Sequence, residues 1–447
     1  MKLFLSLPLF FASLVAFTQE QDTVVLTLDD CINYAIENNI ALQRAKNSEL
    51  IARANRFQAI MNFFPTLTAG INYDFFFGNF FDQNAARQVS ETTNSSQPNL
   101  SSSLTIFNGF SNQYFLKGRI QEQKSAEENV KNMTLNVTAN ILLFYLQVAT
   151  NKERVNVSQG RVDLLETQLD RELKRIEVGV GSPEAAYQLK GQLSNEKLTL
   201  ITDKNNLRRN LLTLVQEMQL GVDKVYDVST LEVSDSDLLL KIDPFDQVLS
   251  ESLSINPNLK RANADLEASR YSLKAFKAAR TPTVAFFGRI GSNYSSNGAR
   301  NPETGDFEEN ASFQDQLEFN QFEYVNFSLS IPIFSRYERT TDVQVAKVNY
   351  VNAELDKKQA VNNITNTVQQ VYLDLIAGQQ TYQSAVENME AQESSFRFIK
   401  KRFDVGNTDF NAYLESLNNK NAAEIQLLSS KYEILLRKKI LDLYRGV

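Results

Sequence analysis

The sequence predicts a mainly α-helical protein with a small β part. Two observations predict the helices: apolar residues recur at alternating spacings of four and three along two stretches, and these stretches lie in proline-free segments, 111–177 and 337–403. A third observation predicts the β part, because the apolar period changes to two after Pro65 and again after Pro282. Long helical hairpins carrying short β-hairpins follow from this order.

The helical pattern occurs twice at a constant offset of 227 residues. A 3-4 spacing of this kind places one seam along a long helix, as in coiled-coil packing. The second-half seam consists of Val371, Leu375, Gly378, Tyr382, Ala385, Met389, Gln392, Phe396, Ile399 and Phe403. Its first-half counterpart consists of Phe144, Val148, Asn151, Val155, Ser158, Val162, Leu165, Leu169, Glu172 and Ile176. Each seam stops at a Val-Gly pair, so we expect a turn and a returning helix after it.

Composition excludes several function classes. The net charge of −7 argues against nucleic-acid binding, because no basic excess is available for phosphates. The chain has no histidine and one cysteine, Cys31, which we expect to be a small apolar residue on a helix face. This inventory excludes zinc sites and Cys-His or Ser-His catalysis. We therefore predict no metal, no cofactor and no enzymatic activity.

Residues 1–18 have the pattern of a secretory signal peptide. Lys2 is the positive region, an apolar stretch follows to Phe17, and Ala16 and Thr18 are the small residues before a cleavage point at Gln19. No later run of eighteen apolar residues occurs, so we expect no transmembrane helix after it. An exported chain of this kind can meet a membrane through β-strands.

The remaining chain divides into two similar halves. The first, 19–220, is expected to contain a helix from Leu28 to about Met61, a β-hairpin at 65–107 and long helices at 111–177 and 183–220. A connector with a small β element, 221–242, leads to the second half, 243–447. That half is expected to contain a helix with Asp243 as its N-cap, a β-hairpin at 282–333 and long helices at 337–403 and 409–445. Pairs matched before the hairpins are offset by 217, so ten extra residues are expected within the second strand-loop-strand segment, at its exposed tip.

The two β-hairpins have the length and alternation of membrane-spanning strands. The first strand is expected to run from Thr66 to Phe75, and aromatic residues gather at its ends, as aromatic girdles do. Lipid does not tolerate open sheet edges, and four strands cannot close a barrel alone. We therefore expect other copies of the chain to complete the barrel, in a cyclic homo-oligomer.

The order of these elements resembles the TolC-like outer membrane efflux proteins (outer membrane factors). The motifs that carry the resemblance are Leu28 to Asn39, Phe64-Pro65-Thr66-Leu67, Leu329 to Phe334 and the two Val-Gly turns. It implies a homotrimer whose four strands per chain form a twelve-stranded outer membrane barrel, continued by an α-helical tunnel across the periplasm. It also implies an outer membrane location in a Gram-negative bacterium, a periplasmic adaptor protein and an inner-membrane pump of the RND or ABC type.

The resemblance also implies site residues at the helical turns. The adaptor would meet the turns at Val178, Gly179, Val180, Val405, Gly406 and Asn407. The periplasmic entrance would be lined by Thr408, Asp409 and Glu415; some family members carry an arginine at the position of Thr408, so that particular gate bond is in doubt here. Helix capping explains the glycines equally well, and a solvated helix face explains the carboxylates.

The function predicted first is a passive exit duct of a tripartite efflux or type I secretion system. The alternative is a structural or adhesive coiled-coil protein of the envelope without a transport role, which explains the seams but not the paired hairpins. A single-chain porin would need more strands.

Overall fold

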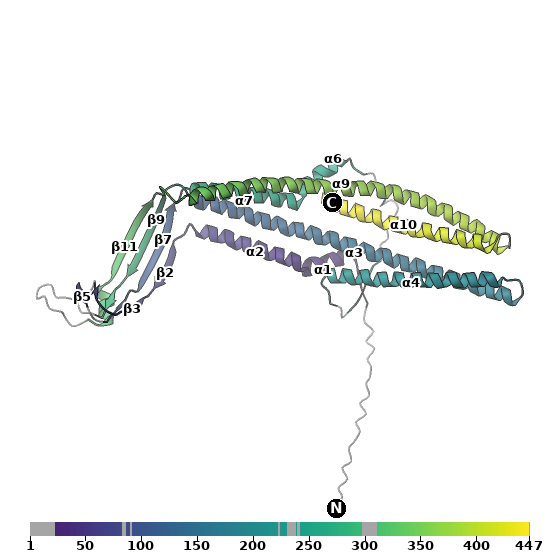
Figure 1. Cartoon of the computed structure of the whole chain (residues 1–447), viewed down its shortest axis with the longest axis horizontal. Coiled ribbons are helices and arrows are strands. Elements are labelled where there is room, and N and C mark those ends of the chain that lie inside the picture. Colours follow the sequence, from purple (N-terminus) through teal and green to yellow (C-terminus); the bar gives the residue numbers. More distant parts are fainter. Residues whose placement is uncertain are drawn as a thin grey trace, which may run out of the picture. The chain divides into compact units, whose positions relative to one another are not determined.

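The computed structural model describes residues 23–82, 86–89, 92–221, 224–229, 238, 242–296 and 311–446 (Figure 1). The predicted signal peptide, 1–18, and residues 297–310 of the predicted second β-hairpin lie outside these residues. The helices are α1 (Leu28–Asn38), α2 (Ile40–Met61), α3 (Ser111–Glu177), α4 (Pro183–Glu217), α6 (Phe245–Ile255), α7 (Pro257–Ala278), α8 (Phe313–Phe319), α9 (Glu338–Asp404) and α10 (Phe410–Arg445). The strands are β1 (Thr23–Leu26), β2 (Thr66–Gly70), β3 (Tyr73–Phe76), β4 (Phe80–Asp82), β5 (Arg87–Val89), β6 (Thr93–Ser96), β7 (Asn99–Phe107), β8 (Val225–Val228), β9 (Thr283–Gly291), β10 (Tyr294–Ser295) and β11 (Phe322–Ser330). The mainly helical fold class is confirmed.

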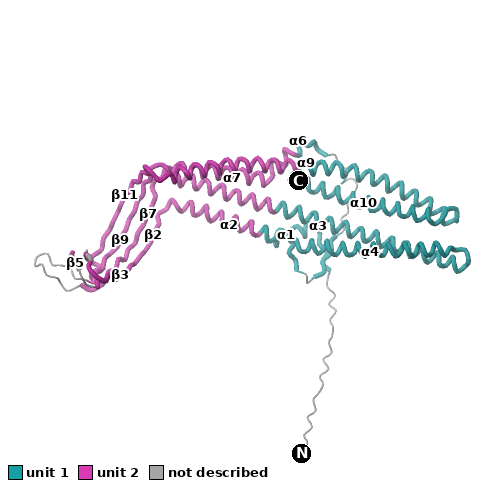
Figure 2. Tube along the Cα trace, viewed as in Figure 1, with its two compact units in different colours: residues 1–42, 134–248, 368–447 teal, residues 43–133, 249–367 magenta. Residues whose placement is uncertain are grey.

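The chain forms two compact units (Figure 2). One contains residues 1–42, 134–248 and 368–447, with the helical hairpins; the other contains 43–133 and 249–367, with the strands of the β-hairpins. Both units draw on both sequence halves, because α3 and α9, each 67 residues long, contribute to both.

The predicted first helix is in fact two helices. Asn39 has extended backbone (φ −60°, ψ 120°), and its side-chain oxygen accepts a hydrogen bond from Leu42 N at 3.1 Å, which caps the start of α2. Asn256 separates α6 from α7 in the same way and accepts from Asn258 N at 2.9 Å. The prediction of one continuous helix was wrong because an asparagine cap competes locally with the helical backbone.

The strands are shorter than predicted. The strand expected to reach Phe75 stops at Gly70, because the next partner on β7 would be Pro98, which has no N–H to donate. The following residues leave the four-stranded sheet, and β3 pairs with β6 instead. Likewise β11 stops at Ser330, two residues before Pro332, and Tyr294 lies in β10 rather than in β9.

The ten extra residues of the second half are also placed differently. The offset is 217 between the starts of β2 and β9, 223 between the starts of β7 and β11, and 227 between the starts of α3 and α9. Only six of the extra residues therefore fall in the hairpin. The other four lengthen the connection from β11 to α9, residues 331–337, where Ile333 and Phe334 are 94% and 82% exposed.

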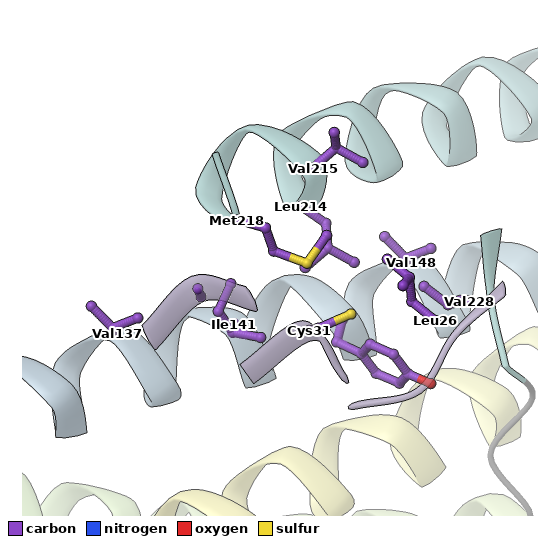
Figure 3. Close-up of a cluster of buried hydrophobic side chains, with 11 residues drawn as sticks. Leu26, Cys31, Val137, Ile141, Val148, Leu214, Val215, Met218 and Val228 are labelled. Carbon is purple, nitrogen blue, oxygen red and sulfur yellow. The ribbon is translucent and has the colours of Figure 1, made fainter. Parts of the chain in front are cut away.

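The helical unit has a core beside a small parallel sheet. β1 pairs with β8, so the β element expected in the connector is present. Two other residues with a strand-like pattern in the connector, Leu231 and Val233, lie outside the described residues. The core gathers Leu26, Cys31, Ala35, Val137, Ile141, Tyr145, Val148, Leu214, Val215, Met218 and Val228 (Figure 3). Cys31 is fully buried, as expected, and burial raises the pKa of its thiol to about 12, with the Asp30 carboxylate adding to the shift. Lys152 Nζ joins α3 to β8 through Asp227 Oδ2 at 2.7 Å.

Both predicted seams are inside the helical packing. No seam residue of α3 or α9 is exposed, and in the second seam Val371, Leu375, Tyr382, Ala385 and Phe396 are buried. The capping box of Thr27 and Asp30 is also present, with Thr27 N donating to Asp30 Oδ2 at 3.0 Å. Asp243 is not the predicted helix cap: α6 begins at Phe245, and the Asp243 carboxylate pairs with Arg445 at 2.7 Å.

Among the described helices, α3 alone is long and apolar enough to cross a membrane by length and composition. Its best window of eighteen residues has a mean hydropathy of 1.2, and 39% of that window is buried. Core helices pass the same test, and the stretch around Ile141 and Tyr145 is part of the core described above.

Candidate functional site

The turn between α3 and α4 is a tight helix cap with exposed valines. Gly179 has a left-handed backbone (φ +79°), and its N–H donates to Ile176 O at 3.0 Å. Val180 N donates to Arg175 O at 2.9 Å, which completes a Schellman motif. Val178 and Val180 are 73% and 66% exposed.

The turn between α9 and α10 repeats this geometry. Gly406 has φ +75°, its N–H donates to Phe403 O at 3.0 Å, and Asn407 N donates to Arg402 O at 2.8 Å. Val405 beside it is 78% exposed. The capping explanation of both glycines is thus correct, and it leaves two valines exposed on the first turn and one on the second.

One arginine stabilises each turn. Arg175 Nη2 donates to Val180 O at 3.4 Å, and Arg402 Nη2 donates to Asn407 O at 3.1 Å. These arginines are separated by 227 residues, the offset of the seams. A cation at a helix C-terminus also complements the partial negative charge of the last carbonyls.

The predicted entrance residues have different roles in the structure. Asp409 is the N-cap of α10, and its Oδ1 accepts from Ala412 N at 2.7 Å. Thr408 is half-buried, whereas Glu415 is exposed one turn further along α10. The structure therefore brings Thr408 and Asp409 into the second turn and leaves Glu415 on the helix surface.

An aromatic cluster beside the second turn was missed by the sequence reasoning. Phe403 stacks on Tyr413 with ring centroids 4.8 Å apart, and Phe410 contacts both rings. Tyr413 is only 1% exposed, and its hydroxyl has no hydrogen-bond partner among the residues that the structure describes. Burial raises the pKa of this hydroxyl to about 12. The sequence signal for this cluster was the spacing of Phe410 and Tyr413, which are three residues apart in the first turn after the Asp409 cap and so lie on one face of α10.

Two polar links between the helical hairpins were also missed. Arg171 on α3 pairs with Asp404 on α9 at 2.9 Å. Deeper in the packing, Arg161 Nη2 donates to Asn421 O on α10 at 2.7 Å, and Arg161 Nη1 lies 3.6 Å from Glu196 Oε1 on α4. Glu424 on α10 completes this buried charge cluster at 3.7 Å. The partners are too far apart in sequence for a spacing argument to find.

No cluster of three or more metal-ligating side chains occurs among the described residues. Both turns expose valine side chains beside a capped backbone.

The model of the family described as outer membrane efflux protein matches residues 31–218 and 248–446. These two segments include both helical hairpins and both turns.

The chain belongs to the outer membrane efflux protein family.

Known members and solved structures are similar to it at low sequence identity. The outer membrane protein TolC of Salmonella enteritidis is 18% identical over 325 residues, which span 71% of this chain and 63% of TolC. The structure of VceC from Vibrio cholerae matches with a TM-score of 0.77 and 13% identity, covering 94% of this chain and 96% of VceC. The structure of CmeC from Campylobacter jejuni matches with a TM-score of 0.75 and 16% identity, covering 99% of this chain and 93% of CmeC. The structure of CusC matches with a TM-score of 0.78 and 14% identity, covering 95% of this chain and 93% of CusC.

These matches establish the fold of an outer membrane efflux protein. They give no support to the alternative of a structural coiled-coil protein without a transport role.

Proposed function

We propose that this chain is one of three identical subunits of an outer membrane exit duct. The observation that carries the proposal is the four-stranded sheet β11-β9-β7-β2. Leu67, Val325, Phe327 and Leu329 on one of its faces are each more than 60% exposed. An exposed apolar face on a sheet with two open edges is unfavourable in water, and open edges are unfavourable in lipid.

Several copies of the sheet can form a closed barrel in which every pair of neighbouring strands is antiparallel. All three pairings in the sheet are antiparallel, so the outer strands β2 and β11 run in opposite directions. β2 of one copy can therefore pair antiparallel with β11 of the next, which gives a cyclic, head-to-tail assembly. Two copies would give a barrel filled by its own side chains, whereas three give twelve strands and a lumen.

The long helices supply the wall of the duct beyond the membrane. α3 has 67 residues, which corresponds to about 100 Å at ~1.5 Å per residue. In the assembled duct, each chain contributes two helical hairpins from two repeats, 19–220 and 243–447, joined by the connector 221–242. The duct is passive: a closed wall keeps the exported solute away from lipid and periplasm.

The helical turns are the proposed contact with a periplasmic adaptor, which links the duct to an inner-membrane pump of the RND or ABC type. Val178, Val180 and Val405 expose apolar surface at chain reversals whose backbone is already satisfied internally. Such a surface can bind a partner without unfolding the turn. Gly179, Gly406 and Asn407 shape it, and the entrance residues named above lie beside it.

Opening of the entrance requires the second helical hairpin to move away from the first. The Arg171–Asp404 pair joins them near the turns, with side chains 53% and 34% exposed. Exposed pairs of this kind contribute only ~0.2–1 kcal/mol, so an adaptor can displace this one at small cost.

The assembly is tested on the purified, detergent-solubilised protein by native mass spectrometry and by conductance in planar lipid bilayers. A trimer that forms water-filled channels is expected. A monomer that stays in solution without detergent would refute the proposal.

Docking is tested separately with Val178→Glu and Val405→Glu, which leave the caps intact. Loss of pump-dependent resistance with normal trimer yield is expected, and the matched pair Val178→Thr and Val405→Thr should retain it. Unaltered resistance in the glutamate variants would show that the turns are not the docking surface.

A further inference from the structure

The two faces of the four-stranded sheet differ in chemistry. Paired residues of antiparallel strands point to the same face, so the register assigns the side chains of all the paired residues. One face carries Leu67, Ala69, Leu100, Ser102, Leu104, Phe107, Val284, Phe286, Gly288, Ile290, Glu323, Val325, Phe327 and Leu329. The other carries Thr66, Thr68, Gly70, Asn99, Ser101, Ser103, Thr105, Thr283, Ala285, Phe287, Arg289, Gly291, Phe322, Tyr324, Asn326, Ser328 and Ser330. The second, polar face is the lumen face of the proposed barrel.

Arg289 is the single charged residue on the polar face of these four strands. The other charge in the strands, Glu323, pairs in register with Ile290 and therefore lies on the apolar face. Arg289 pairs with Tyr324 on β11 and with Ser101 on β7, which are neutral. No ion pair of Arg289 occurs within the described part of the chain, and its Nε has no hydrogen-bond partner.

Three aromatic side chains share the polar face with this guanidinium, and one of them lies against it. Arg289 lies over the ring of Phe322, with its Cζ 5.6 Å from the centroid. Phe287 and Tyr324 form a tilted pair at 6.3 Å on the same face, and Tyr324 is 50% exposed. The lumen-facing residues of β2 and β7 are by contrast only serine, threonine, asparagine and glycine. We call Phe287, Arg289, Phe322 and Tyr324 the arginine–aromatic patch.

We propose that the arginine–aromatic patch is a transient binding site in the lumen for exported solutes that carry an anionic group on an aromatic body. The guanidinium fork matches carboxylate and sulfonate oxygens, and the neighbouring rings offer stacking surface to the same solute. In the trimer the patch occurs three times at one depth, and rings of arginine favour anions in pores. The proposal rests on the trimeric duct proposed above, and it names a substrate class for that duct.

The test uses the purified trimer in planar bilayers. The probe is naphthalene-2-sulfonate, compared with a naphthyl trimethylammonium cation of similar size. We expect the sulfonate to interrupt the current and the cation to do so less. Arg289→Gln should weaken the sulfonate block about tenfold, the effect of losing one charge-assisted contact, and should shift the reversal potential in a KCl gradient toward cation preference.

Three further variants separate charge, stacking and background. Arg289→Lys should keep the reversal potential but weaken the block, because lysine lacks the planar fork. Phe322→Leu should weaken the block while leaving the reversal potential unchanged. Glu323→Gln, on the opposite face, is the matched control and should change neither. Trimer yield by native mass spectrometry shows whether each variant assembles.

The outcomes distinguish this proposal from the one on which it rests. A conducting trimer whose sulfonate block is the same in Arg289→Gln, Phe322→Leu and the original chain overturns the binding site and leaves the duct standing. A protein that forms no channel at all overturns both.

Discussion

The buried charge cluster around Arg161 allows a quantitative test of how much a buried ion pair contributes to the stability of the helical packing. The Arg161 and Glu196 side chains are 9% and 11% exposed, whereas Glu424 is 35% exposed. Removal of one partner of a buried pair typically costs 3–5 kcal/mol, because the remaining charge is left uncompensated in the interior. We expect Arg161→Met to fall in that range and Glu424→Gln to cost less than ~1 kcal/mol.

The double variant decides whether this reasoning is correct. Arg161→Met combined with Glu196→Gln removes both buried charges, so it should be more stable than Arg161→Met alone, with a coupling of about 0.5–3 kcal/mol. The assay is thermal and denaturant unfolding of the detergent-solubilised protein, followed by circular dichroism of the helices. If Arg161→Met costs no more than Glu424→Gln, or if the double variant is the least stable, the cluster is solvated and the argument fails.

Three further predictions concern single residues of the helical hairpins. The raised pKa of Tyr413 means that between pH 10 and about 12 the unfolded chain has lost the phenolic proton while the folded chain retains it, so stability should fall as pH rises through this window. Tyr413→Phe should be neutral or stabilising at pH 8 and should flatten the alkaline loss in pH-dependent unfolding; an unchanged alkaline limb would contradict this. Gly181→Ala should destabilise the protein by roughly 1–3 kcal/mol, because a Cβ there would lie 2.5 Å from Ile176 N. The control is Gly191→Ala, at a helical position with open space around it, which should stabilise the protein by up to ~1 kcal/mol in the same unfolding experiments. Equal effects of the two variants would show that the turn relaxes freely. Asp409→Ala should cost about 0.5–2 kcal/mol through loss of the cap on α10, with Asp409→Asn as the conservative control that should retain most of the stability.

Much of the fold could be predicted from local patterns. The seams and the limits of α3 depend on residues within one or two helical turns, and the structure confirms them. The helix breaks at Asn39 and Asn256 were missed because the apolar period continues through them. The two asparagines are separated by 217 residues, the offset of the matched pairs before the hairpins, and Pro257 directly follows Asn256. A comparison of the two repeats at this offset could have predicted both breaks.

The candidate site could be predicted only in part. The glycines of both turns were found because left-handed backbone selects glycine locally. The Arg161 cluster could not be found in this way, since Asn421 lies 260 residues from Arg161 and only the packed hairpins bring the two together. Arg289 lies in a strand with alternating polarity. Only the register of the four strands shows that it is the single charged residue on its face of the sheet, because the register places Glu323 on the opposite face.

The open edges of the sheet have a genetic consequence. In the proposed trimer, a ring built head to tail would need both β2 and β11 intact in every member, so one defective edge would leave the whole barrel unclosed. A proline in the middle of β2, for example Thr68→Pro, removes a backbone donor from the strand that forms one of these edges. In a cell that makes equal amounts of normal and altered chains with random assembly, about one trimer in eight would contain normal subunits alone. Such an allele should therefore be dominant over the normal one.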